Sequence, residues 1–177
     1  MNGGRTAPSD REGGFTLVEL LAVVAITCTL LAIGVGALRT YWLRQGLVRS
    51  SAELVTEMRG AQQRAVAESH PLVFGIRVSP GSGTWSIVRF QPGSPGSCSE
   101  VERHSFPASV VVSSAAFAVS DPPTTICRQV FGGTNQFAFF FARGTATGGA
   151  LELSSPFTST TMKIAVFGVS GRIEEQE

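Results

Sequence analysis

One carboxylate stands inside a long apolar run near the start of the chain. The run extends from Phe15 to Leu38, follows a leader that ends at Gly14, and contains a single charged residue, Glu19. An acidic side chain at the centre of a membrane-spanning helix disfavours insertion by about 2.5–3.5 kcal/mol, and by less near an end. Because a cation can neutralise such a group where the dielectric constant is low, Glu19 is a candidate for pairing with a charged partner.

The rest of the chain lacks the residue patterns of common catalytic and metal sites. There is no G-x-S-x-G motif, and the two histidines, His70 and His104, are expected to be solvated loop residues. Glu100 and Glu102 are expected on a loop as part of a solvated face. The Gly144–Gly149 segment lacks the Lys-Ser/Thr of a phosphate-binding loop, so we expect a hairpin turn there. The sequence therefore predicts no enzyme activity, no metal and no cofactor.

Three cysteines bear on the compartment. Cys28 lies in the apolar run, where it acts as a small hydrophobic side chain. Cys98 and Cys127 lie in polar, loop-like sequence. They are candidates for a disulfide if the domain is exported, and are two free thiols if it stays in the cytoplasm. Neither belongs to a CxxC or a Cys/His metal spacing.

The charge after Ser69 is balanced, since that part of the chain has seven basic and seven acidic residues. No overall electrostatic field therefore favours nucleic acid. Removing the leader and the apolar run leaves 139 of the 177 residues, which is an ordinary size for one domain.

The chain divides into four segments. Residues 1–14 form a polar leader, and residues 15–38 are apolar for 24 positions, or roughly 36 Å of helix, enough to cross a bilayer core. Residues 39–69 are amphipathic, and residues 70–177 form a β-rich domain. The amphipathic stripe recurs at helical spacing and predicts one helix from about Phe15 to about Ser69, ended by Pro71; its members are Leu43, Leu47, Leu54, Met58, Ala61 and Ala65.

Beyond Pro71 the hydrophobic period changes to two, which predicts strands. The expected strands are residues 72–78 and 85–90 as a hairpin, 110–112, a central phenylalanine-rich strand at 136–142, 150–154, and 162–169. One long helix followed by antiparallel strands predicts an α+β fold in which the amphipathic half of the helix packs on an antiparallel sheet.

The segment G-F-T-L-V-E-L-L-A-V-V-A-I, from Gly14 to Ile26, resembles the prepilin signature of type IV pilins and type II secretion pseudopilins. The resemblance implies that a membrane peptidase cuts after Gly14 and that the new terminal Phe15 is methylated. It also implies a role for Glu19 in assembly, because its carboxylate can neutralise the terminal amine of a neighbouring subunit.

A second resemblance covers the carboxy-terminal quarter. The phenylalanine strand, the Gly-rich turn, the next strand and Val169-Ser170-Gly171-Arg172 resemble the FimT and type II secretion protein H branch. In DNA-binding FimT-like pilins the closing glycine–arginine is followed by another basic residue. Here acids follow Arg172, which argues against DNA binding through Arg172 and Lys163 and favours a role for Arg172 in capping the last strand.

These resemblances imply a minor pilin or pseudopilin that helps to assemble or prime a filament for secretion or pilus biogenesis. The implied partners are other pilin subunits, the prepilin peptidase and an inner-membrane assembly platform. The implied location is the inner membrane, crossed once, with an extracytoplasmic domain, and afterwards the filament. Arg39, Arg44 and Arg49 follow the apolar run, so the positive-inside count alone does not place the amino terminus in the cytoplasm. The alternative function is a DNA-binding minor pilin for transformation.

Overall fold

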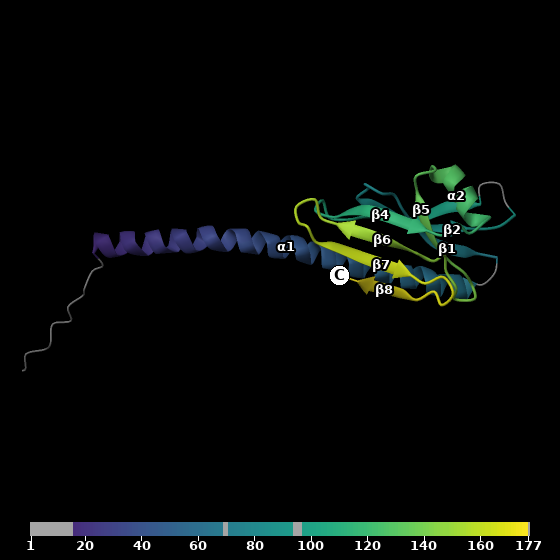
Figure 1. Cartoon of the computed structure of the whole chain (residues 1–177), viewed down its shortest axis with the longest axis horizontal. Helices are drawn as coiled ribbons and strands as arrows, with labels where there is room; N and C mark the ends of the chain where they lie inside the picture. Colours follow the sequence, from purple (N-terminus) through teal and green to yellow (C-terminus); the bar gives the residue numbers. More distant parts are fainter. Residues whose placement is uncertain (1–15, 69–70, 94–96, 177) are drawn as a thin grey trace, which may run out of the picture. The chain divides into compact units, whose positions relative to one another are not determined.

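The computed structural model describes residues 16–68, 71–93 and 97–176, with the helices and strands shown in Figure 1. It separates into two units, Met1–Arg39 and Thr40–Glu177. One helix, α1 (Leu17–Glu68), contributes to both. The predicted helix end at Ser69, and His70 beside it, lie outside the described residues.

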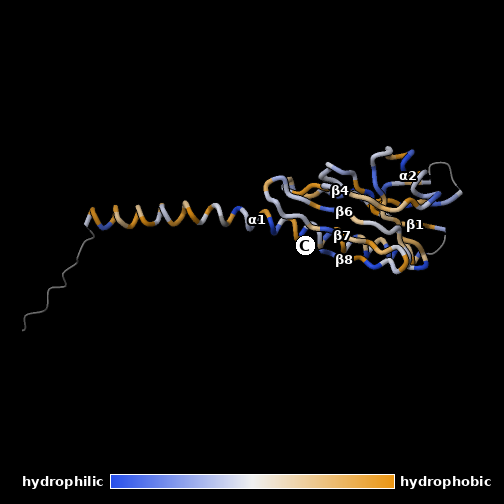
Figure 2. The backbone as a smooth tube through the Cα atoms, viewed as in Figure 1, coloured by the Kyte–Doolittle hydropathy of each residue, from blue (hydrophilic) through white to orange (hydrophobic). Residues whose placement is uncertain are grey.

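The two halves of α1 differ in what surrounds them. In the first unit the large apolar side chains that the structure describes are exposed, and Figure 2 colours this part of the helix backbone as mainly hydrophobic. In the second unit the predicted stripe is confirmed, because Leu47, Leu54, Met58, Ala61 and Ala65 are at most 1% exposed. Leu43, the first member of the predicted stripe, is only half-buried.

Within the described residues, eight strands form two antiparallel four-stranded sheets, which together with α1 confirm the predicted α+β fold. One sheet has the order β3-β2-β1-β5, made of Cys98–Ser105, Thr84–Phe90, Val73–Val78 and Gln136–Phe140. The other has the order β4-β6-β7-β8, made of Val111–Phe117, Gly149–Ser154, Thr161–Val166 and Ile173–Gln176. The predicted hairpin is the β1–β2 pair, with Val78 opposite Trp85.

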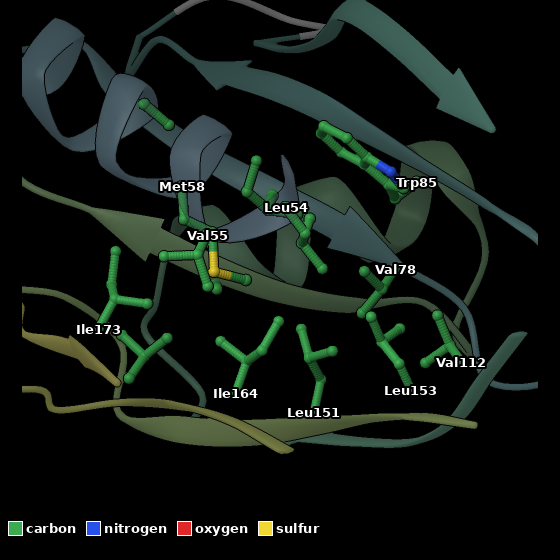
Figure 3. Packing of buried hydrophobic residues seen from close by; sticks show 14 of the residues in the cluster. Leu54, Val55, Met58, Val78, Trp85, Val112, Leu151, Leu153, Ile164 and Ile173 are labelled. Atoms are coloured by element: carbon green, nitrogen blue, oxygen red, sulfur yellow. The ribbon is translucent and has the colours of Figure 1, made fainter. Parts of the chain in front are cut away.

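The main hydrophobic core lies between α1 and both sheets. Figure 3 shows Leu54, Val55 and Met58 of α1 across from Leu151, Leu153 and Ile164 of the second sheet. Burial of such apolar side chains is the dominant stabilising term in folding, at about 25 cal/mol per Å² of apolar surface. The apolar stripe of α1 is thus held by contacts with strands distant in sequence.

A second, smaller core joins the outer face of the first sheet to α2 (Pro123–Phe131). Phe137 and Phe139 of β5 face this core, whereas Phe140 faces the main one. A disulfide between Cys98 of β3 and Cys127 of α2 crosses the small core. Both faces of β5 are therefore covered, which accounts for three phenylalanines in close succession.

Two segments predicted as irregular are regular. Residues 98–105 form β3 rather than a loop, and the acids there pair with arginines from other elements, Glu102 with Arg64 and Glu100 with Arg77. Cys127 was expected in loop-like sequence, but Pro123 begins the helix α2 that contains it; proline fits the first turn of a helix, where its missing N–H has no intrahelical partner. Cys127 therefore lies in a helix and Cys98 in a strand.

The predicted arrangement of the phenylalanine strand is also wrong. β5 lies at an edge of its sheet, and β5 and β6 belong to different sheets, so Gly144–Gly149 does not join a hairpin of these two strands. The chain does turn at Gly144 and pairs briefly with β5 through Phe140 and Ala146. It then crosses to the second sheet, where a Cβ on Gly148 would lie 3.2 Å from the Gly168 nitrogen. Local periodicity does not reveal which strands pair over such a crossing.

Candidate assembly site

The start of α1 is a capping box. The Glu19 N–H donates to Thr16 Oγ1 at 3.2 Å, and the Thr16 N–H donates to Glu19 Oε2 at 3.3 Å. The reciprocal bonds satisfy backbone donors that have no partner inside the helix. The T-x-x-E spacing at Thr16–Glu19 signals this motif, which the sequence reasoning missed. Gly14 and Phe15, the predicted cleavage and methylation residues, lie outside the described residues.

Glu19 thus has a local structural role in addition to its candidate role in assembly. Its side chain is exposed in the isolated chain and lies in the first turn of α1. A negative charge in the first turn is also favoured by the helix macrodipole. The arrangement fixes the carboxylate beside the helix start, where a cation could approach it in a medium of low dielectric constant.

The surface that follows Glu19 suits an apolar medium. The large apolar side chains of residues 17–38 are 50–77% exposed; they are Leu17, Val18, Leu20, Leu21, Val23, Val24, Ile26, Leu30, Leu31, Ile33, Val35 and Leu38. The hydroxyl groups of Thr27 and Thr29 donate to backbone carbonyls of Val23 and Ile26, at 2.7 and 2.8 Å. Among the described residues α1 is the one helix whose length and composition would allow it to cross a membrane.

A β-bulge in β3 separates the two acids that were expected on a solvated loop. Ile87 pairs with Glu102 and Val88 with Glu100, which leaves Val101 as the extra residue. Glu102 meets Arg64 of α1 at 2.9 Å, and that hydrogen bond holds the pKa of the Glu102 carboxyl below its usual value. Its neighbour on the same strand face, His104, stacks on Trp85 with the ring centroids 4.2 Å apart. His104 is therefore a packed strand residue, not a solvated loop histidine.

Glu100 binds two arginines on the α2 side of the same strand. Arg77 approaches at 2.6 Å and Arg103 at 2.9 Å. Burial raises the pKa of Glu100, but the hydrogen bonds from Arg103 and the charge of Arg77 outweigh burial, so its pKa lies below the usual value. Arg77 also lies 4.4 Å from the centre of the Phe131 ring in α2. Both acids are thus structural ion-pair partners rather than an acid–base pair.

The two residues considered for DNA are not brought together. Arg172 pairs with Glu174 at 3.0 Å and lies 4.7 Å from the centre of the Phe167 ring. Lys163 lies at the far end of the β7–β8 pair, opposite Gln176, with Glu174 and Glu175 in between. Within the part of the chain that the structure describes, no cluster of three His, Cys, Asp or Glu residues could hold a metal.

The glycine before Arg172 forms a close junction. Gly171 has φ +62°, and a Cβ added there would lie 2.1 Å from the Gly144 carbonyl oxygen and 2.4 Å from Gln62 Nε2. Gln62 of α1 donates to that carbonyl at 3.1 Å. The turn at Gly144, the turn at Gly171 and the helix therefore meet at one point, where there is no room for a side chain.

Comparisons with known proteins agree with the predicted amino-terminal motif and with the observed fold. The prokaryotic N-terminal methylation motif matches residues 9–35. Together with the apolar helix, this motif supports anchoring in a membrane. No curated protein is significantly similar to the chain in sequence.

Two solved structures, both of the minor pseudopilin EpsH from the type 2 secretion system of Vibrio cholerae, share the fold. The first has a TM-score of 0.52 at 9% identity and covers 73% of this chain and 95% of that chain. The second has a TM-score of 0.51 at 7% identity and covers 74% of this chain and 93% of that chain. The chain thus combines a prepilin methylation motif with the fold of a pseudopilin, as its sequence predicts. The motif and the fold are those of structural pilin subunits, and the narrower FimT or protein H branch stays a prediction.

Proposed function

We propose that this chain is a minor pseudopilin or pilin: a structural subunit that is held in the inner membrane, cut after Gly14, methylated on Phe15, and then built into a filament. The observation that carries the proposal is the capped start of an exposed apolar helix, with Glu19 as the one acid of the run. The first half of α1 then supplies the contact with other subunits, and the β-rich domain stays outside the cytoplasm.

Assembly gives the exposed apolar helix a setting that suits it. Twelve large apolar side chains exposed on one helical segment need a lipid bilayer or other helices around them. Cleavage after Gly14 would create a cationic amine beside this apolar surface. A neighbour's Glu19 can neutralise that amine, so two unfavourable isolated charges become one pair.

The disulfide supports an extracytoplasmic place for the domain. Disulfides persist in oxidising compartments and are rare in the cytosol. The Cys98–Cys127 bond links β3 to α2 across the small core. The assembly partners would be other pilin or pseudopilin subunits and an inner-membrane platform, and the filament would serve either secretion or a pilus.

DNA binding remains the second candidate only through Arg172 and Lys163. The ion pair of Arg172 with Glu174 and the acids between Arg172 and Lys163 oppose phosphate binding. The structural role of Arg172, against Phe167 and Glu174 at the start of β8, is the better supported one.

Processing by a prepilin peptidase tests the proposal. On co-expression with the peptidase, we expect the intact mass to fall by that of residues 1–14 and to rise by that of one methyl group. A Gly14→Leu variant serves as the matched control, because it should keep the leader and the precursor mass. A wild-type chain that keeps its leader beside an active peptidase would show that the proposed maturation is wrong.

A further inference from the structure

Two neighbouring aromatic residues lie exposed on α1 directly after the apolar run. Tyr41 is 55% exposed and Trp42 is 58% exposed. Their rings contact each other edge to face, with centroids 6.0 Å apart and planes at 72°. The folded domain covers the helix increasingly after this pair: Leu43 is half-buried, Gly46 lies beside Ser109 and Leu47 is fully buried. The main core therefore gives no account of this pair.

The number of helical residues before the aromatic pair predicts how deep the pair lies in a bilayer. Leu17–Leu38 makes 22 residues, or about 33 Å, close to the roughly 30 Å of a hydrocarbon core. Trp42 follows Leu38 by four residues, about 6 Å further, which corresponds to the headgroup layer. Tyr and Trp concentrate at this layer because each ring is apolar with one polar edge. Arginines at positions 39 and 44 flank the pair, and guanidinium groups suit phosphate.

We propose that Tyr41 and Trp42 form an interfacial anchor that binds the phosphate–glycerol layer of the phospholipid bilayer before assembly. This inference rests on the proposed function, because it requires the run before the anchor to span the membrane. It also fixes the position of Glu19. Glu19 precedes Trp42 by 23 residues, about 35 Å of helix, so the anchor holds the carboxylate near the opposite interface. There an unpaired acid is less unfavourable than at the bilayer centre.

Fluorescence quenching measures the depth of this anchor, because the chain has two tryptophans and Trp85 is only 2% exposed. The full-length Trp85→Phe chain is reconstituted in phosphatidylethanolamine–phosphatidylglycerol vesicles that carry brominated phospholipids. We expect Trp42 to lose most of its emission when the bromines lie near the headgroup, and much less when they lie near the methyl ends. The Trp42→Phe chain, in which buried Trp85 is the sole reporter, should show no loss.

Two outcomes would overturn the anchor: no quenching of Trp42, as expected if another protein covers it, or stronger quenching by the deep bromines. If Trp85→Phe disturbs the fold, the difference in quenching between the wild type and Trp42→Phe gives the same quantity.

A third chain, Leu30→Trp with both native tryptophans replaced by Phe, reports on the middle of the run. If deep bromines quench the residue at position 30 but shallow bromines leave Trp42 unaffected, the anchor fails and the membrane span stands. If neither residue is quenched, the membrane span required by the proposed function fails as well.

Discussion

The Glu19→Gln chain should insert and mature normally but should be missing from the filament. Removing one member of a buried ion pair costs about 3–5 kcal/mol, because the other charge is left without compensation. The corresponding loss of incorporation is at least about a hundredfold, since 1.4 kcal/mol is a factor of ten. The measurement is the amount of this chain in sheared filaments relative to the amount in the membrane fraction.

Glutamine separates the two roles of this position. The last residue of a capping box, which is the third residue of the helix, can be Gln as well as Glu. Glu19→Gln therefore keeps the local bond to Thr16 and removes only the charge. The matched control is Thr16→Val, which removes the hydroxyl of the cap and keeps the carboxylate. We expect Thr16→Val to assemble. Normal assembly of Glu19→Gln together with failure of Thr16→Val would show that the capped helix start matters and the charge does not.

The second large effect is expected at Gly171. Alanine there must adopt φ +62° and place its Cβ against the Gly144 carbonyl and Gln62. The left-handed conformation costs about 1–2 kcal/mol and overpacking about 1–3 kcal/mol. The free energy of unfolding of Gly171→Ala should therefore be lower than that of the wild type by about 3 kcal/mol or more. For a domain of this size the midpoint of thermal unfolding should fall by roughly 10 °C. Circular dichroism of the full chain in detergent micelles measures it.

Gly144 is the matched control for that substitution. It also has a positive φ, +78°, but an added Cβ would meet no heavy atom within 4 Å. Gly144→Ala should therefore lose only the conformational term, about 1–2 kcal/mol. Equal losses in the two variants would mean that the junction with Gln62 does not hold α1 to the two turns.

The sequence predicted the long helix and its buried stripe because both depend on local spacing, whereas the assembly role of Glu19 stays a prediction. Hydrophobic period and turn residues likewise identified the β1–β2 hairpin. The T-x-x-E spacing of Thr16 and Glu19 was equally local but was overlooked beside the pairing role of the acid.

The wrong predictions concern strands whose surroundings are set by residues distant in the sequence. The acids of β3, Glu100 and Glu102, look solvated in the sequence because their partners, Arg77 and Arg64, come from other elements. The Phe137–Phe140 run looked central because it is apolar on both faces, but the second face is covered by α2 and the disulfide. A local pattern measures how deeply a strand is buried, not which neighbour buries it.

The pairing of Glu19 with a neighbour's terminal amine is the central claim, and zero-length cross-linking of assembled filaments tests it most directly. A carbodiimide joins a carboxylate to an amine only where the two groups touch, and mass spectrometry identifies the linked peptides. We expect a link between the Glu19 peptide of this chain and the amino-terminal peptide of an adjacent subunit, and no such link in filaments that were not treated with carbodiimide. Recovery of Glu19 linked only to the Phe15 amine of its own chain, or unlinked in filaments that cross-link at other contacts, would contradict the account.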